Sequence, residues 1–287
     1  MQMNFMLHYH DRLAGTHRCR TKLNSRCIFG MFSKYINRFS SSYLVSLLIV
    51  FFATCAHASG PEQWQLGFQE AGNNFMRKVT AFQNLIFIIM FLIVLFVTMI
   101  TIYVLIRYNK KSNPVPSTTS HNTAIEIAWT LIPILIVIAI SFPSIKLLSY
   151  SEKIPEADMT IKVAGYQWYW NYDYPDYEIN YDSNIVYDIS ENQRRLLEVD
   201  NRLILPVGTV IRVLVSSGDV IHSFGVPSLG VKRDAIPGKI NETWFEIDKE
   251  GVYYGQCYEL CGAYHGFMPI VIEAISKDDF KKWVKSQ

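Results

Sequence analysis

The segment GQCYELCGAYHGFM at residues 255–268 places two cysteines, a histidine and a methionine within one short stretch of chain. These are Cys257, Cys261, His265 and Met268, and a second histidine, His222, precedes them. Thiolate, imidazole and thioether ligands together suit copper, or zinc if the thioether is ignored, whereas magnesium and calcium prefer oxygen. The pattern therefore predicts a soft-metal site. A disulfide between the two cysteines is the alternative that the cysteines alone leave open.

Most of the remaining cysteines and histidines fall in the first 58 residues. This segment contains a basic stretch, an apolar run over residues 43–55, and then Ala-His-Ala at 56–58 as a cleavage site, which is the order of a secretory signal. The apolar run is shorter than the about 20 residues that a membrane-spanning helix requires. We therefore expect residues 1–58 to be a leader that is removed after Ala58.

Two further apolar segments, at residues 85–106 and 127–148, are long enough to cross a membrane. They exclude a membrane-free protein and predict a transmembrane hairpin within residues 59–149. The loop between them carries three basic residues, and its one acidic residue is Glu126, directly before the second segment, so the loop should face the cytoplasm or its organellar equivalent. Those basic residues are Arg107, Lys110 and Lys111.

From residue 150 to residue 287, short alternating segments separated by glycine and proline replace helical periodicity, as is typical of a β-sandwich or barrel. We predict strands at residues 160–163, 166–174, 196–199, 203–216, 243–247, 252–256 and 270–275. A closing amphipathic helix is expected from Ser276 to Val284, with Ser276 and Asp279 spaced as a capping box. The net charge of +2, with no basic cluster among exposed aromatics outside the leader, gives no indication of nucleic-acid binding.

A Greek-key sandwich that supplies one ligand from an earlier strand and the others from a late loop is how cupredoxins hold copper. Two cysteines four residues apart can bridge two copper ions, with His222 and His265 on different metals. From Trp64 to the C-terminus the sequence closely resembles subunit II of haem-copper cytochrome c oxidases of the proteobacterial and mitochondrial type. The most specific segments are LEVDNR at 197–202, VPSLG at 226–230, and residues 257–268.

The resemblance implies a two-helix transmembrane hairpin followed by an all-β cupredoxin domain that holds a binuclear copper centre. It also implies that the backbone carbonyl of Glu259 completes the centre, and that the Glu259 carboxylate helps bind a magnesium ion shared with subunit I. The side-chain ligands that it implies are His222, Cys257, Cys261, His265 and Met268.

The function implied by the resemblance is acceptance of electrons from cytochrome c, soluble or tethered. The electrons would pass through the copper pair to the haem-copper subunit, where oxygen is reduced to water with proton translocation. Trp168 would be the residue where electrons enter, and Glu126 would take up protons. The partners would be subunit I, further subunits and cytochrome c. No Cys-x-x-Cys-His haem motif occurs, so the cytochrome should be a separate chain.

Simpler roles compete for several of these residues. Thr123 and Glu126 have the spacing of a helix-capping box. Core packing and a membrane-interface aromatic belt can account for most rings of the run 166–174, in which alternation puts Trp168, Trp170, Tyr172 and Tyr174 on one strand face. Six acidic residues are either a solvated surface or, by the resemblance, a dock for a basic cytochrome c; they are Asp173, Asp176, Glu178, Asp182, Asp200 and Asp219.

The chain departs from the family pattern at two positions near these sites. Tyr166 stands where many members have histidine, and Gly218 stands where an acidic residue is frequent. We expect the first to leave electron input unaffected and the second to weaken the acidic dock.

The competing functions are a membrane-tethered copper carrier or thiol oxidoreductase, a structural zinc site, and a quinol oxidase subunit of the same fold. The zinc site gives Met268 no role, and the quinol oxidase branch has lost the copper ligands. The expected location is a bacterial inner membrane with the C-terminal domain in the periplasm. The alternative is the mitochondrial inner membrane, with the domain in the intermembrane space.

Overall fold

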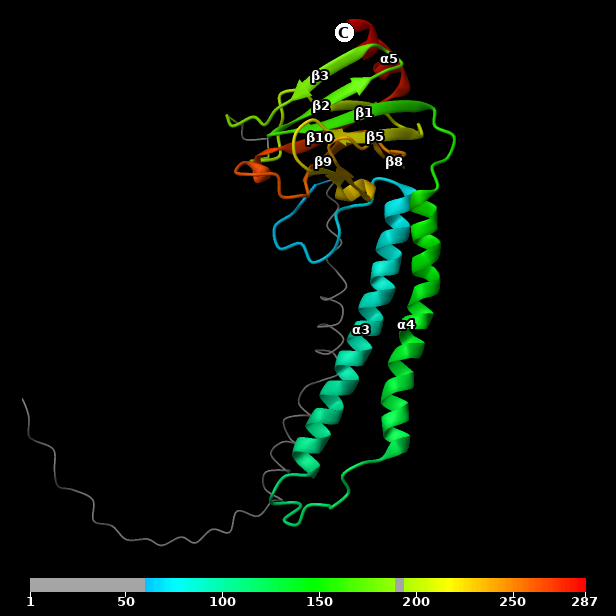
Figure 1. Ribbon diagram of the computed structural model, residues 1–287, viewed down its shortest axis with the longest axis vertical. Coiled ribbons are helices and arrows are strands. Elements are labelled where there is room, and N and C mark those ends of the chain that lie inside the picture. The colour runs from blue at the N-terminus through cyan, green and yellow to red at the C-terminus, as the bar shows by residue number, and fades with distance from the viewer. Residues whose placement is uncertain (1–59, 189–193) are drawn as a thin grey trace, which may run out of the picture. The chain divides into compact units, whose positions relative to one another are not determined.

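The computed structural model describes residues 60–188 and 194–287, so the predicted leader and its cleavage site lie outside the described residues. In the part of the chain that the structure describes, two long helices come first, α3 over Asn74–Arg107 and α4 over Thr123–Glu152 (Figure 1). Most of their large apolar side chains are exposed, and both helices are long and apolar enough to cross a membrane. The segments 85–106 and 127–148 lie within them.

Each helix begins at an asparagine cap. The Asn73 side chain accepts a hydrogen bond from the Met76 amide at 2.7 Å and donates one to the Leu229 carbonyl at 3.0 Å, which ties the start of α3 to the β domain. For α4 the predicted cap was wrong, because Asn122 rather than Thr123 is the N-cap and accepts from the Ile125 amide at 3.2 Å. Asparagine caps at least as well as threonine, so the helix starts one residue earlier than the capping-box pattern requires.

The described residues of the β domain form two five-stranded sheets (Figure 1). In spatial order, the first sheet contains β3 (Ile179–Ser183), β2 (Tyr169–Tyr174), β1 (Met159–Tyr166), β5 (Ile211–Ser217) and β8 (Asn241–Phe245). The second contains β4 (Leu203–Pro206), β10 (Pro269–Ile275), β9 (Gly251–Cys257), β6 (His222–Val226) and β7 (Val231–Ala235). Parallel pairing of β1 with β5, and of β4 with β10, gives the crossed connections of a Greek-key sandwich.

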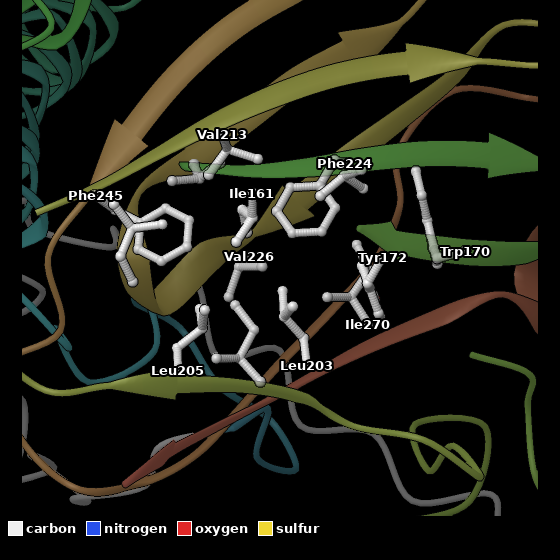
Figure 2. Packing of buried hydrophobic residues seen from close by; sticks show 14 of the residues in the cluster. Ile161, Trp170, Tyr172, Leu203, Leu205, Val213, Phe224, Val226, Phe245 and Ile270 are labelled. Carbon is white, nitrogen blue, oxygen red and sulfur yellow. The ribbon is translucent and has the colours of Figure 1, made fainter. Parts of the chain in front are cut away.

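The core lies where the two sheets face each other. Figure 2 shows Ile161 and Val213 of the first sheet pointing toward Phe224 and Ile270 of the second. All four side chains are fully buried, and each such residue contributes about 1.5–3 kcal/mol relative to an exposed position. Alternation is regular along β5, whose buried and partly exposed residues alternate throughout.

Several predicted strands were wrong in detail. The segment 166–174 is broken by a turn at Gln167 and Trp168, and residues 203–216 split into β4 and β5. Residues 196–199 form only an isolated bridge, from Val199 to Ile185. Strands β3, β6 and β7 were not predicted. Strand β6 is buried along its whole length and so lacks alternation, and β7 is an edge strand that carries charged residues.

The predicted closing helix is confirmed as α5 (Lys277–Ser286). The Ser276 hydroxyl caps it by accepting from the Asp279 amide at 3.1 Å. Phe280 is buried and Trp283 packs against the core, so this short helix closes one end of the sandwich.

Candidate metal centre

Strand β6 begins with His222, whose ring is completely buried. The ring lies against β1 at Gly165, where a Cβ atom would come within 2.9 Å of it. Asp219 lies 2.8 Å from the His222 Nε2 atom, so the ring presents Nδ1 to the cysteines, 4.0 Å from the Cys257 sulfur. A carboxylate that orients a histidine through its second nitrogen is the usual arrangement around a metal-binding imidazole.

The other donors lie on the loop that joins strands β9 and β10. Cys257 is the last residue of β9, and its amide donates to the Met268 carbonyl at 3.3 Å, which closes the base of the loop. The Cys261 sulfur lies 3.5 Å from the Met268 sulfur and 3.6 Å from His265 Nδ1. Antiparallel pairing of β9 with β10 therefore brings together residues at both ends of the loop.

The two cysteines are free, with their sulfurs 3.9 Å apart. A disulfide has a sulfur–sulfur distance of about 2.05 Å, so the disulfide alternative does not describe this structure. A metal–thiolate bond is about 2.3 Å long, and an ion between the two sulfurs can lie at that distance from both, so one ion can contact both sulfurs. His222, Cys257 and Cys261 are all buried and close enough to share a metal ion.

The pKa values of the two cysteines and of His222 are shifted in different directions within this cluster. Burial alone would raise the pKa of Cys257, but hydrogen bonding by His222 and by backbone groups outweighs it and lowers the pKa. Burial and the adjacent Cys257 sulfur raise the pKa of Cys261 to about 12. For His222, burial acts to lower the pKa, but contacts with Cys257 and Asp219 dominate and raise it. Metal binding to these groups must therefore displace protons.

The remaining predicted site residues occupy three different places. The Glu259 carbonyl lies 3.3 Å from the Cys257 sulfur and so faces the cluster, while the residue as a whole is exposed. Trp168 lies in the turn between β1 and β2, where it packs edge-on against Tyr264 at 4.9 Å between ring centroids. Glu126 lies in the first turn of α4 and is not part of the cluster.

The aromatic run is divided by the turn that precedes β2. Trp170, Tyr172 and Tyr174 share one face of β2 and are completely buried, so core packing is confirmed for them and a membrane-interface belt is wrong. Trp168 does not share that strand face, contrary to the prediction, because it precedes the strand. Trp170 also lies beside the cluster, with its indole N–H donating to the Met268 carbonyl at 3.3 Å.

The two departures from the family pattern are in contact with each other. The Tyr166 ring fills the space beside Gly218, where a Cβ atom would lie 2.2 Å from the ring. The same ring stacks on Tyr169 with centroids 5.1 Å apart. A side chain at position 218 would therefore displace Tyr166. The sequence alone gave no indication that these two departures are linked.

Sequence reasoning missed the roles of Asp219 and Gln167. Asp219 was predicted as either a solvated surface acid or a docking acid, although a carboxylate three residues before a candidate histidine ligand is a usable signal. Gln167 gave no signal, because its contact with Cys261 joins residues 94 positions apart.

A pair of apolar helices followed by a two-sheet sandwich with a buried thiol, imidazole and thioether cluster defines a membrane-anchored protein of the cupredoxin class. Family profiles described as "Cytochrome C oxidase subunit II, transmembrane domain" and "periplasmic domain" match residues 61–147 and 159–275. The probable cytochrome c oxidase subunit 2 of Rickettsia bellii is 50% identical over 252 residues, which cover 87% of this chain and 94% of that protein. The chain belongs to the cytochrome c oxidase subunit II family.

Two further proteins that the chain resembles carry related names. Cytochrome c oxidase subunit 2 of Cyanidium caldarium is 47% identical over 232 residues, which cover 78% of this chain and 91% of that protein. The crystal structure of the periplasmic domain of cytochrome oxidase subunit II from Bradyrhizobium japonicum is 52% identical, covers 47% of this chain and 96% of that domain, and has a TM-score of 0.45.

Family membership defines the general role of the chain. It is a subunit of cytochrome c oxidase, which is an oxidoreductase, and it works with the other oxidase subunits. It is a membrane protein with a C-terminal β domain. Together with the family, the histidine–cysteine–cysteine cluster indicates copper. A two-sheet sandwich does not fit the alternative of a thioredoxin-like thiol oxidoreductase.

Proposed function

We propose that the cluster binds two copper ions and receives electrons from cytochrome c. The side chains of His222, Cys257, Cys261, His265 and Met268, with the carbonyl of Glu259, would hold the pair. When bound, the copper pair supplies a one-electron acceptor whose charge is shared between the ions. The observation that carries the proposal is the convergence of two sulfurs 3.9 Å apart with a different histidine beside each one.

The surrounding residues support this assignment by their positions. Asp219 holds the buried His222 ring with Nδ1 toward the sulfurs, and Trp170 fixes the Met268 carbonyl. Burial of the cysteines and Met268 excludes water from the sulfurs. Ligands held before metal binding need little rearrangement when the charge of the centre changes.

The test of the ligand assignment is a Cys261→Ser variant of the oxidase, with Ala263→Ser as control at an exposed position of the same loop. Loss of one bridging thiolate should abolish the spectrum of an electron shared over two copper nuclei, whereas the control should keep it. A retained spectrum in Cys261→Ser would refute the assignment.

Trp168 is proposed as the residue where electrons enter from cytochrome c. It lines a groove of about 300 Å³ together with Asn184, Ile185, Tyr187, Tyr264 and Phe267. One electron leaves the reduced cytochrome and one is gained by the centre, with no bond made or broken. Such an exposed aromatic groove offers contact area to the edge of a donor haem.

The acidic dock for cytochrome c is proposed to lie around this groove. The six predicted acids fall into two groups along β2. The first group lies near the Trp168 end, and each member accepts a hydrogen bond there. Asp182 accepts from the Asn171 side chain and Asp200 from the side chain of the groove residue Asn184. Asp219 accepts from the backbone amide of Gln167. The second group lies toward the other end of β2; its members are Asp173, Asp176 and Glu178. Only the first group can add charge beside Trp168.

Glu259 is proposed to bind magnesium at the contact with subunit I. Its carbonyl faces the cysteines, which leaves the carboxylate of an exposed residue free for a hard ion. Glu259→Gln keeps the carbonyl and removes the charge, so the oxidase should bind Mn²⁺, as a probe for this site, more weakly with an unchanged copper spectrum. Equal Mn²⁺ occupancy would contradict the assignment.

Glu126 is proposed to take up protons at the end of α4 that lies beside the short connecting loop. Because Asn122 caps this helix, the carboxylate is not needed as the capping-box partner. Glu126→Ala should slow proton uptake and leave the copper spectrum intact, and Asn122→Ala should lower helix stability without that effect. Normal turnover of Glu126→Ala would count against the proton role.

The location is proposed to be the bacterial inner membrane, with the β domain in the periplasm and residues 1–58 removed as a leader. The basic loop between the helices supports a cytoplasmic connection. Protein sequencing of the mature N-terminus and protease access to the β domain in intact spheroplasts test this arrangement. A mitochondrial inner membrane with the domain in the intermembrane space is the alternative.

A further inference from the structure

Gln167 contacts both segments that carry the proposed copper ligands. It is the first residue of the turn between β1 and β2, and Trp168 is the second. Its side-chain amide donates to the Cys261 carbonyl at 2.8 Å. Its backbone amide donates to Asp219 at 2.7 Å.

The contact with Asp219 leads to the strand ligand. One oxygen of this carboxylate accepts from Gln167 and the other lies 2.8 Å from His222 Nε2. A single carboxylate therefore joins the Trp168 turn to the buried histidine. Hydrogen bonds to a charged group are about twice as strong as neutral ones, so the Asp219 carboxylate should hold the turn and the His222 ring in fixed positions.

The contact with Cys261 leads to the loop ligands. Gly262 follows Cys261 with a backbone φ of +124°, in the region that favours glycine. A Cβ atom there would lie 3.0 Å from the Gln167 amide nitrogen and 3.1 Å from Trp168 Cζ2. The missing side chain thus lets both Gln167 and Trp168 pack directly on the peptide next to Cys261.

From this geometry we infer that Gln167 is a positioning residue that couples Trp168 to the metal-binding segments. Electronic coupling falls more steeply across a gap than along bonds and hydrogen bonds. The Gln167 amide supplies such a bonded route from the Trp168 backbone to Cys261, and it holds the indole against Gly262. The inference rests on the proposed roles of Trp168 and of the copper cluster.

The test uses the copper-loaded oxidase with Gln167→Met, which keeps side-chain length and removes the donor. The control is Asn180→Leu, which removes an exposed amide that pairs with Asn171 rather than with the ligand loop. At saturating reduced cytochrome c, electron transfer within the complex should slow about tenfold or more in Gln167→Met. The cytochrome c concentration for half-maximal rate and the copper spectrum should stay unchanged in both variants.

A second measurement needs no copper. In the copper-free full chain, Gln167→Met should speed hydrogen exchange of the loop amides at residues 261–265 about fivefold, since one hydrogen bond to the loop is lost. The Asn180→Leu control should leave that exchange unchanged.

Three results would overturn the inference. Faster exchange with normal electron transfer would make Gln167 a structural residue only. A rise in the half-maximal cytochrome c concentration at an unchanged limiting rate would make it a docking residue. An altered copper spectrum with slower transfer would assign it to ligand placement instead of coupling. These results differ from those expected if the proposed function itself were wrong. In that case Trp168→Phe would accept electrons from cytochrome c at the normal rate, or the parent oxidase would contain no copper at this site.

Discussion

Aromatic clusters at the two ends of strand β2 differ in burial and hydrogen bonding. Tyr174 and Tyr181, with Phe280 and Trp283, form what we call the closed cluster. Tyr174 is fully buried and its hydroxyl donates to the Ile204 carbonyl at 2.9 Å, while Tyr181 donates to the Arg202 carbonyl at 2.9 Å. Burial raises the pKa of Tyr181 to about 12, as expected for a hydroxyl removed from water.

The opposite end carries what we call the open cluster, which consists of Trp168, Tyr264 and Phe267. Tyr264 is 51% exposed, whereas the Trp168 indole N–H is buried and has no hydrogen-bond partner within the described residues. The rings still contact one another, with Trp168 and Tyr264 at 4.9 Å and Tyr264 and Phe267 at 5.7 Å. The same residue types therefore stabilise the fold at one end and leave a contact surface at the other.

The largest expected effect is on stability, at the closed cluster. Tyr174→Ala should lower the free energy of unfolding by about 3–5 kcal/mol, because it removes a buried ring and leaves a cavity. Denaturant unfolding of the full chain in detergent, followed by tryptophan fluorescence, measures the change. Tyr264→Ala at the open cluster should cost far less, and equal losses would break the distinction between the clusters.

The next effect is on electron input, at the open cluster. Trp168→Phe should slow electron transfer from cytochrome c about a hundredfold, as expected when a reacting contact is misplaced. The copper spectrum and the unfolding midpoint should be unchanged. Stopped-flow mixing with reduced cytochrome c gives the rate, and a rate within twofold of the parent would remove Trp168 from the pathway.

Removal of a single tyrosine hydroxyl should also affect the two clusters differently. Tyr181→Phe should cost about 1–2 kcal/mol of stability, because the Arg202 carbonyl and the Tyr174 hydroxyl each lose a partner. Tyr264→Phe should change stability by no more than about 0.5 kcal/mol, since this residue is half exposed. Thermal unfolding of both variants in parallel provides the measurement, and similar shifts would contradict the assignment of the hydroxyls.

The smallest effect concerns the acids beside each cluster. Asp182→Asn, near the open end, should lower the second-order rate with a basic cytochrome c about threefold at low salt, because it reduces electrostatic steering. Asp176→Asn, near the closed end, should have less effect. Both differences should fade as ionic strength rises. A larger effect for Asp176 would place the dock at the other end of β2.

The two helices and the loop ligands could be predicted because their signals are local. Long apolar runs predict α3 and α4, and the spacing of Cys257, Cys261, His265 and Met268 predicts a metal loop. Strand β6 was missed although it carries His222, since burial on both faces removes the alternation that marks a strand.

Tertiary contacts explain the remaining differences. The break at Gln167 and Trp168 divides an aromatic run that alternates without interruption in the sequence. The dual role of Asp219 depends on a hydrogen bond to Gln167 across 52 residues. The contact of Tyr166 with Gly218 likewise joins distant segments, so none of these features is visible in a local pattern.

The most direct test of the account is the metal content of the purified full chain loaded with copper, together with its optical and electron paramagnetic resonance spectra. Two coppers per chain, and a signal from one electron shared over both nuclei, are the predicted results. One labile copper, or no copper with a disulfide between Cys257 and Cys261, would contradict the binuclear centre and favour a copper carrier or a thiol-exchange protein.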